Sequence, residues 1–177
     1  MVCARCIRIV REELRNIGLV VTSVSLGKAT VENKNVSLTE IKEVLLRNGF
    51  DLIEDKNLAL VEEVKTLLIE KINGEGDLMK FKLSVYLEQQ LNKKYSFISR
   101  VFSRVKGKTI ERYFIELKIE KVKELIDYNE LSFSEIAFRL GYSALQHLSS
   151  QFKRMTGISM SAYRENKNKK RISIDSI

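Results

Sequence analysis

Two cysteines near the start of this 177-residue sequence have the spacing of a metal-binding pair. Cys3 and Cys6 form a C-x-x-C motif at the point where the apolar spacing of the following residues predicts a helix. Two neighbouring thiolates suit a soft ion such as Cu(I), and a helix N-terminus and Arg5 favour the thiolate form. The sequence requires no cofactor, and Cu(I) or another soft metal at Cys3 and Cys6 is the candidate ligand. A redox pair and two inert cysteines are the alternatives.

Hydrogen-bonding side chains recur in two later stretches, residues 96–104 and 145–154. An arginine such as Arg100 can bind guanine O6 and N7 through two hydrogen bonds, and an amide such as that of Gln146 can pair with adenine. The chain has a single histidine, and its sequence contains no nucleophile paired with it, no glycine-rich phosphate loop and no cluster of carboxylates. Because no catalytic constellation is assembled, the sequence predicts a binding protein and not an enzyme.

The second of these stretches follows a pattern of helix, tight turn and helix. Ser132 and Glu135 have the spacing of a capping box, which begins a helix. Gly141 suits the sharp turn, Ser143 is expected to cap the second helix, and Gly157 is expected to end it. This order is that of a helix-turn-helix unit. The residues expected in its core are Ile136, Ala137, Leu140, Leu148 and Phe152.

The same unit occurs earlier in the chain, at an offset of 50 residues. In this first copy we expect a helix before residue 92, a turn at residues 92–94, and Ser96 as the cap of the second helix. A long helix over Ile110–Tyr128 joins the copies, and ~17 helical residues span roughly 26 Å. Two recognition helices on such a rod can reach successive major-groove segments, which lie ~34 Å apart. The matched pairs are Ile98 and Leu148, Ser99 and Ser149, Phe102 and Phe152, Arg104 and Arg154, Gly107 and Gly157, Thr109 and Ser159, and Tyr113 and Tyr163.

The positive charge of the chain is confined to its second part. Residues 1–77 hold 11 Lys and Arg against 13 Asp and Glu, whereas residues 78–177 hold 20 against 10, so the net charge of +8 arises after residue 77. The division falls in the glycine-rich segment 73–77. A basic half of this kind predicts an anionic partner such as nucleic acid. No apolar run approaches the ~20 residues of a membrane span, so a membrane is not expected as a partner.

Residues 78–166 resemble the AraC-type DNA-binding domain, a family of transcriptional regulators. The resemblance implies two helix-turn-helix units joined by a long helix, with double-stranded DNA as the ligand. The sequence departs from the family at Met160, where a proline is usual. The motifs that carry the resemblance are the run SEIAFRLGYS from Ser134, the run HLSSQFKR from His147, Thr156-Gly157, and Tyr163-Arg164.

The resemblance and the helix pattern together predict which side chains contact DNA. The second helix of each unit enters the major groove with its early outward positions near base edges, while basic residues further along bind phosphate. The predicted base-reading residues are Ser96, Ser99, Arg100, Leu145, Gln146, His147, Ser149 and Ser150. The predicted phosphate-binding residues are Arg104, Lys106, Lys108, Lys153, Arg154 and Arg164.

The first part of the chain resembles the small heavy-metal-associated domain of copper chaperones and metal-transporting ATPases. A helix from Cys6 to Ile17, strands at Val20–Ser25 and Ala29–Glu32, a helix capped by Ser37 and a last strand at Phe50–Ile53 give the order α-β-β-α-β. That order implies a ferredoxin-like fold with the metal at the C-x-x-C pair. Nothing precedes Met1 in this sequence, so the first strand of the family is expected to be missing.

The predicted protein is mostly α-helical, with a small N-terminal α+β domain that is ferredoxin-like and truncated. The expected divisions are residues 1–56 for the metal-binding-like domain, 57–77 for a connecting helix and linker, 78–166 for the tandem helix-turn-helix domain, and 167–177 for a basic tail. We predict a cytoplasmic, sequence-specific transcriptional regulator with a soft-metal or redox sensor. Double-stranded DNA is the expected partner, and a metal ion, a second copy of the chain and RNA polymerase are further candidates. The alternative is a metal chaperone or buffer whose basic half docks partners.

Overall fold

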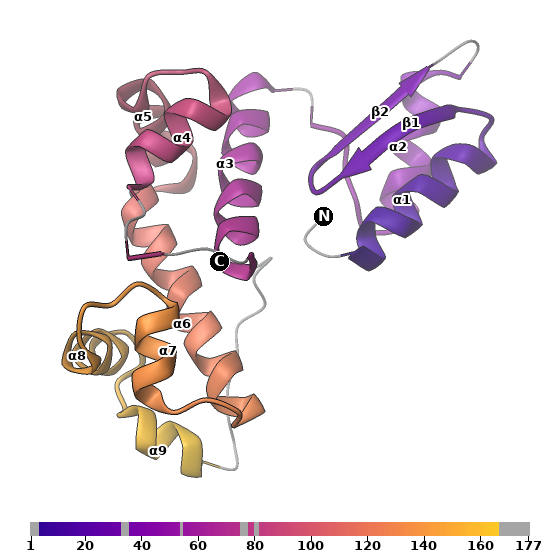
Figure 1. The fold of residues 1–177 in the computed structure, drawn as a ribbon. Helices are drawn as coiled ribbons and strands as arrows, with labels where there is room; N and C mark the ends of the chain where they lie inside the picture. Colours follow the sequence, from indigo (N-terminus) through magenta and orange to yellow (C-terminus); the bar gives the residue numbers. More distant parts are fainter. Residues whose placement is uncertain (1–3, 33–35, 54, 75–77, 80–81, 167–177) are drawn as a thin grey trace. The chain divides into compact units, whose positions relative to one another are not determined.

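A computed structural model describes residues 4–32, 36–53, 55–74, 78–79 and 82–166 (Figure 1). The chain divides into two compact units, Met1–Thr66 and Leu67–Ile177, and the boundary lies inside helix α3, Lys56–Asn73. The predicted basic tail, residues 167–177, and Cys3 lie outside the described residues. Within the described ranges, no helix combines the length and the apolar character needed to cross a membrane.

The N-terminal unit is a hairpin with two helices packed together over one apolar core. Helix α1, Ala4–Asn16, is followed by β1, Val20–Ser25, the antiparallel β2, Lys28–Glu32, and α2, Leu38–Arg47. Ser37 caps α2, because its hydroxyl accepts a hydrogen bond from the Glu40 amide at 3.1 Å. The predicted order α-β-β-α is therefore confirmed. The core residues are Val10, Leu14, Leu19, Val24, Ile41 and Leu45.

The last strand predicted for this unit, Phe50–Ile53, was wrong. The described residues of this segment form no strand, and the sheet contains β1 and β2. The amide of Phe50 donates to the carbonyl of Leu45 at 2.9 Å, and its ring packs on the core. Phe50 thus closes the C-terminal end of α2 instead of pairing with a strand, and with two strands the ferredoxin-like fold remains a prediction.

The second unit is helical and is organised around one long helix. It contains α4, Leu83–Leu91, α5, Tyr95–Lys106, α6, Ile110–Tyr128, α7, Phe133–Arg139, α8, Leu145–Thr156, and α9, Met160–Glu165. Helix α6 packs against α5 from the first copy and against α7, α8 and α9 from the second (Figure 1). The bounds predicted for the joining helix, Ile110–Tyr128, are confirmed.

The 50-residue repeat is also present in the packing. The aromatic pair Phe102–Tyr113 has its ring centroids 5.5 Å apart, and the corresponding pair Phe152–Tyr163 has them 5.7 Å apart. The repeat extends to helix ends, since Thr109 caps α6 as Ser159 caps α9. The helix-ending glycines Gly107 and Gly157 both adopt positive φ, as the predicted stop of α8 requires.

Two predicted caps were wrong. The N-cap residue of α5 is Lys94, two residues before Ser96, and that of α8 is Ala144, one residue after Ser143. Neither makes a capping bond through its side chain. The Glu88 carboxylate accepts the Tyr95 amide at 2.6 Å, so a residue of α4 satisfies the start of α5 and Ser96 lies in the first turn. The hydroxyl of Ser143 instead lies 2.9 Å from Nδ1 of His147.

The predicted capping box and turn of the second copy are confirmed. Ser132 and Glu135 exchange both hydrogen bonds, with Ser132 donating its amide to the Glu135 carboxylate at 2.7 Å. Gly141 adopts φ +74° in the turn after α7. A Cβ at Gly141 would lie only 2.6 Å from the carbonyl oxygen of Leu78, so the glycine also makes room for the chain segment that leads into α4.

Candidate nucleic-acid interface

Helix α5 presents a polar face opposite its buried one. Ile98, Val101 and Phe102 are buried, which turns Ser96 and Arg100 to solvent. Arg104 is exposed one turn after Arg100, and Ser99 is half-buried at the edge of the face. The four predicted residues Ser96, Ser99, Arg100 and Arg104 thus lie on one helix.

An exposed aromatic residue on α5 was missed by the sequence interpretation. Phe97 is 40% exposed, and it was not among the residues predicted to contact DNA. The Arg100 guanidinium lies 5.9 Å from the centre of the Phe97 ring, which is within the range of a cation–π contact. The repeat offset was the signal that could have found it, because Phe97 corresponds to His147.

Helix α8 repeats this arrangement. Leu148 and Phe152 are buried against the core, and Gln146, His147 and Ser150 are exposed. The remaining predicted base-reading residues of this helix, Leu145 and Ser149, are half-buried. Serine, amide and imidazole groups on one exposed face can hydrogen-bond to base edges.

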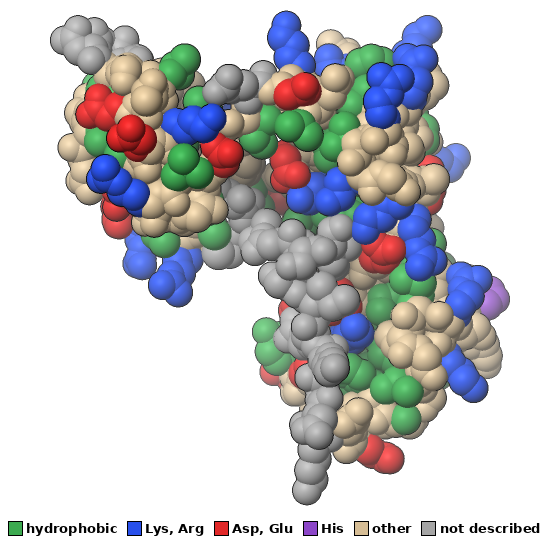
Figure 2. Space-filling model, turned by 180° about the vertical axis from the view of Figure 1, so that it is seen from behind, with side chains coloured by type: hydrophobic (Ala, Val, Ile, Leu, Met, Phe, Trp, Pro, Cys, Tyr) green, Lys and Arg blue, Asp and Glu red, His purple; other side chains and the backbone are tan. Residues whose placement is uncertain are grey.

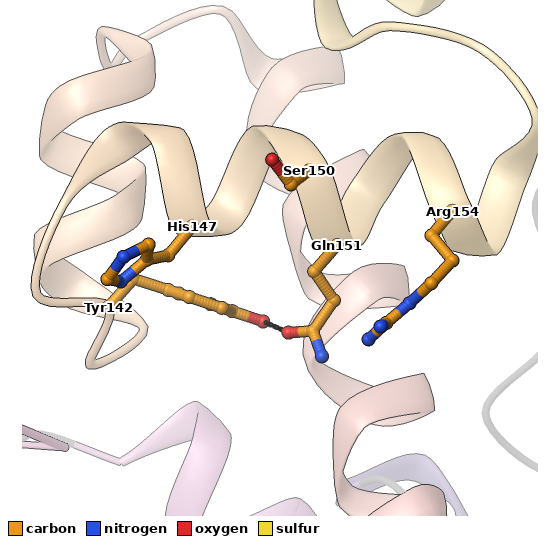
Figure 3. A pocket seen from close by; sticks show the side chains of 5 residues that line it. All are labelled: Tyr142, His147, Ser150, Gln151 and Arg154. Atoms are coloured by element: carbon orange, nitrogen blue, oxygen red, sulfur yellow. Dashed lines mark hydrogen bonds between the residues drawn. The ribbon is translucent and has the colours of Figure 1, made fainter.

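An open hollow of about 380 Å³ lies on one flank of α8 (Figure 3). Its lining residues are Tyr142, His147, Ser150, Gln151 and Arg154. The Tyr142 hydroxyl donates a hydrogen bond to Oε1 of Gln151 at 2.6 Å. Burial raises the pKa of Tyr142 to about 12, so at neutral pH the phenol keeps the proton that it donates. Neither Tyr142 nor Gln151 was singled out from the sequence as a contact residue.

A cation from α6 lies behind this hollow. The Lys118 ammonium is 4.2 Å from the centre of the Tyr142 ring and 5.5 Å from that of Phe114. Burial lowers the pKa of Lys118, because the charged form is less well solvated there. Within the part of the chain that the structure describes, no carboxylate forms a salt bridge with Lys118. Its charge therefore adds to the positive potential of this flank.

A second hollow, of about 240 Å³, lies along α8 toward α9. Its lining includes Lys153 and several serine hydroxyls, and Ser150 borders both hollows. The exposed ridge of α8, formed by Gln146, His147 and Ser150, thus borders both hollows at Ser150. The lining residues are Phe133, Ser149, Ser150, Lys153, Ser159, Met160 and Ser161.

The comparison with known proteins agrees with this geometry. Residues 87–166 match the sequence profile of a family described as a helix-turn-helix domain. This part of the chain is a helix-turn-helix domain. The predicted AraC-type resemblance is thereby confirmed for these residues.

Three known proteins are similar to this chain in its helix-turn-helix part. The MmsAB operon regulatory protein of Pseudomonas aeruginosa is 33% identical over 72 residues, which are 41% of this chain and 23% of that protein. A DNA-binding transcriptional dual regulator from Escherichia coli K-12 is 17% identical, with a TM-score of 0.51 over 65% of this chain and 96% of its own. The C-terminal domain of AraT, a response regulator from Geobacillus stearothermophilus, is 20% identical, with a TM-score of 0.54 over 67% and 98%. The two solved structures establish the shared fold.

The predicted phosphate-binding residues of the helix-turn-helix domain differ in their surroundings. Lys153, Arg154 and Arg164 are exposed, and the Arg164 guanidinium lies 3.9 Å from the centre of the Phe133 ring. Lys106 is half-buried. Figure 2 shows blue Lys and Arg side chains spread over this unit, with fewer red carboxylates between them. The surface is therefore suited to an anionic ligand.

Lys108 has an acidic partner that the sequence did not reveal. Its ammonium lies 2.6 Å from Oε2 of Glu116, and the Arg112 Nε donates to Oε1 of the same carboxylate at 3.0 Å. Burial opposes ionisation of Glu116, yet the hydrogen bonds from Lys108 and Arg112 hold its pKa below the ordinary value. This triad ties the start of α6 to the loop after α5.

Of the two cysteines predicted to bind a metal, the structure describes only Cys6. Cys6 lies in the first turns of α1 and is half-buried. Cys3 lies outside the described residues. The described residues contain no cluster of three or more His, Cys, Asp or Glu side chains that could hold a metal ion. Two thiolates nevertheless fit a linear soft ion, so metal binding at Cys3 and Cys6 stays a prediction.

Proposed function

We propose that this chain is a sequence-specific, DNA-binding transcriptional regulator. One observation carries the proposal: two copies of a helix-turn-helix unit sit on one long helix, and each presents a recognition helix with a polar outer face. The 19 residues of α6 correspond to a rod of roughly 28 Å. A rod of this length supports insertion of α5 and α8 into successive major-groove segments of one duplex.

The residues proposed to read bases are those exposed or half-buried on the outer faces of the two helices. In α5 they are Ser96, Ser99 and Arg100, among which Arg100 has the two-pronged donor that favours guanine. In α8 they are Leu145, Gln146, His147, Ser149 and Ser150. The polar character of these faces disfavours a surface that docks protein partners, which would carry apolar anchors.

Backbone contacts are assigned to the basic residues around these faces. Arg104, Lys153 and Arg154 are exposed on the recognition helices, Arg164 is exposed on α9, and Lys106 and Lys108 are half-buried. Contacts to phosphate orient the domain without selecting a sequence. Their number sets how steeply affinity falls with salt.

Selection from a random duplex library tests the proposal. We expect an enriched motif with two conserved blocks about one helical turn apart, ~10 base pairs centre to centre. In that motif Arg100→Ala should relax one base position, and Lys153→Ala should weaken binding to all duplexes alike. Failure to enrich any motif would refute sequence-specific recognition.

We further propose that the N-terminal unit controls DNA binding through a soft metal or a redox change at Cys3 and Cys6. The fusion of a C-x-x-C helix to a DNA-binding domain supports this. As part of the same proposal, the chain acts in the cytoplasm, forms a dimer and contacts RNA polymerase. Titration of Cu(I) should change the duplex affinity of the wild-type chain and not that of Cys3→Ser. Metal uptake without any change in DNA affinity would favour the alternative, a metal chaperone or buffer.

A further inference from the structure

The hollow beside Tyr142 has the hydrogen-bonding character of an anion site. An amide side chain offers both an acceptor oxygen and a donor nitrogen. In Gln151 the acceptor oxygen is taken by the Tyr142 hydroxyl at 2.6 Å. Figure 3 shows the amide nitrogen directed away from Tyr142, on the side where the Arg154 guanidinium lies. Tyr142 therefore turns Gln151 into a donor beside a cation.

The charge around the hollow has one sign. Arg154 is exposed at its rim, and Lys118 lies behind the Tyr142 ring at 4.2 Å. In the part of the chain that the structure describes, no salt bridge joins either cation to a carboxylate. Ser150 also lines the hollow, although its hydroxyl points away from Gln151 in Figure 3. Cations and hydrogen-bond donors around one hollow suit a phosphate group, whose oxygens accept hydrogen bonds and carry negative charge.

The first helix-turn-helix unit does not repeat this arrangement. At the repeat offset of 50 residues, Asn92 stands in the place of Tyr142, and Val101 stands in the place of Gln151. Val101 is buried in the core of its unit. Only the cation is kept, as Arg104 for Arg154. The hydrogen-bonded pair of Tyr142 and Gln151 is thus a property of the second unit and not of both copies of the repeat.

We propose that this hollow clamps one phosphate of the DNA backbone between Gln151 Nε2 and the Arg154 guanidinium, with Tyr142 as the residue that orients Gln151. This inference rests on the proposed function and deepens it. The contact borders the reading face, since Ser150 belongs both to the hollow and to the exposed ridge of α8. A clamp here sets how α8 lies in the groove without selecting a base.

The first test is Gln151→Glu in the full chain, measured as affinity for the selected duplex. Glutamate keeps the shape of the side chain and the acceptor for Tyr142 but replaces the donor with a negative charge. We expect at least about tenfold weaker binding, the lower end for a hydrogen bond to a charged group. Gln89→Glu, an exposed position on α4, carries the same change of charge and should bind as the wild type. Equal affinities for wild type and Gln151→Glu would overturn the proposal.

The second test identifies the bound group. Each phosphate of the selected duplex is replaced in turn by a neutral methylphosphonate. At one phosphate, the replacement should weaken wild-type binding more than it weakens binding of Gln151→Ala, in which only Arg154 is left to contact that phosphate. If the loss is the same for wild type and Gln151→Ala at every phosphate, the proposal is overturned. It is also overturned if, in addition, the chain without DNA binds inorganic phosphate through Gln151, because the hollow would then bind a free anion and not the DNA backbone.

Tyr142→Phe tests the positioning role. The ring remains over Lys118, and the loss of the hydroxyl should weaken duplex binding about two- to tenfold, the range of a single hydrogen bond. In a Gln151→Ala background the same change should cost nothing more. An equal loss in both backgrounds would assign Tyr142 a purely structural role and overturn this part. A wild-type chain that binds no duplex would refute the proposed function itself, whereas wild-type binding with unaffected variants refutes the clamp alone.

Discussion

A Cβ at Gly141 would collide with the backbone of the segment that precedes α4. The Cβ of Gly141→Ala would lie 2.6 Å from the Leu78 carbonyl oxygen, 2.7 Å from its carbonyl carbon and 2.9 Å from its Cβ. Gly141 also has φ +74°, a conformation that strains any residue with a side chain. Gly157 is the matched control, since its φ is +81° and a Cβ there meets nothing within 4 Å.

The two substitutions separate the backbone strain from the collision. The left-handed conformation costs an L-residue roughly 1–2 kcal/mol, and this cost applies at both positions. Overpacking against backbone that must shift adds about 1–3 kcal/mol, and this cost applies to Gly141 alone. We therefore expect Gly157→Ala to lose about 1–2 kcal/mol and Gly141→Ala about 2–5 kcal/mol of unfolding free energy.

Thermal unfolding of the full chain, followed by circular dichroism, measures this difference. For the helix-turn-helix domain, residues 78–166, each kcal/mol shifts the midpoint by roughly 4–8 °C, so Gly141→Ala should have the lower midpoint of the two variants. Gly141→Ala should also weaken duplex binding, because the turn sets the direction of α8. Equal midpoints for Gly141→Ala and Gly157→Ala would refute the close approach of Leu78, and only the strain argument would stand.

Three further substitutions probe separate contacts of the second unit. Ser132→Ala removes the capping box of α7 and should cost about 1 kcal/mol of stability; an unchanged unfolding midpoint would show that the cap is dispensable. Glu116→Gln should reduce stability at pH 7 and flatten its decline in acid. The lowered pKa of Glu116 means that its contribution is complete above the ordinary value of 4.5 and is lost as pH falls through the lowered one. Superimposable curves of stability against pH would contradict this. Phe97→Leu should leave the midpoint unchanged and weaken duplex binding by about 0.5–1 kcal/mol through the lost contact with Arg100; a fall in the midpoint would make Phe97 a core residue.

Local sequence patterns were sufficient to predict much of the structure of the helix-turn-helix domain. The bounds of α6, the capping box at Ser132 and the positive φ of Gly141 and Gly157 follow from residues within a few positions of each other. Such features depend on helix period and backbone sterics, which act over one or two turns. The repeat of 50 residues then extended the interpretation from the stronger copy to the weaker one.

Predictions failed where another group competes for a polar atom. Ser96 had the residue type of a cap, but the start of α5 is satisfied by Glu88 from the preceding helix. Ser143 was predicted to be a cap, and its hydroxyl lies beside the ring of His147. Phe50 had the apolar character of a strand residue, but its amide closes α2. In each case sequence spacing cannot rank the competing partners, because their distances depend on the fold.

By itself, the sequence determined the second part of this protein as a tandem helix-turn-helix domain with polar, basic recognition helices. Periodicity, capping and charge are encoded in neighbouring residues, so they can be predicted without knowledge of the fold. Only the tertiary structure decided which side chains meet across elements: Tyr142 with Gln151, Lys118 with the Tyr142 ring, and Lys108 with Glu116. Hydrogen bonds and ion pairs act over a few ångströms, and the packing of α6 against the units it carries brings these residues within that range.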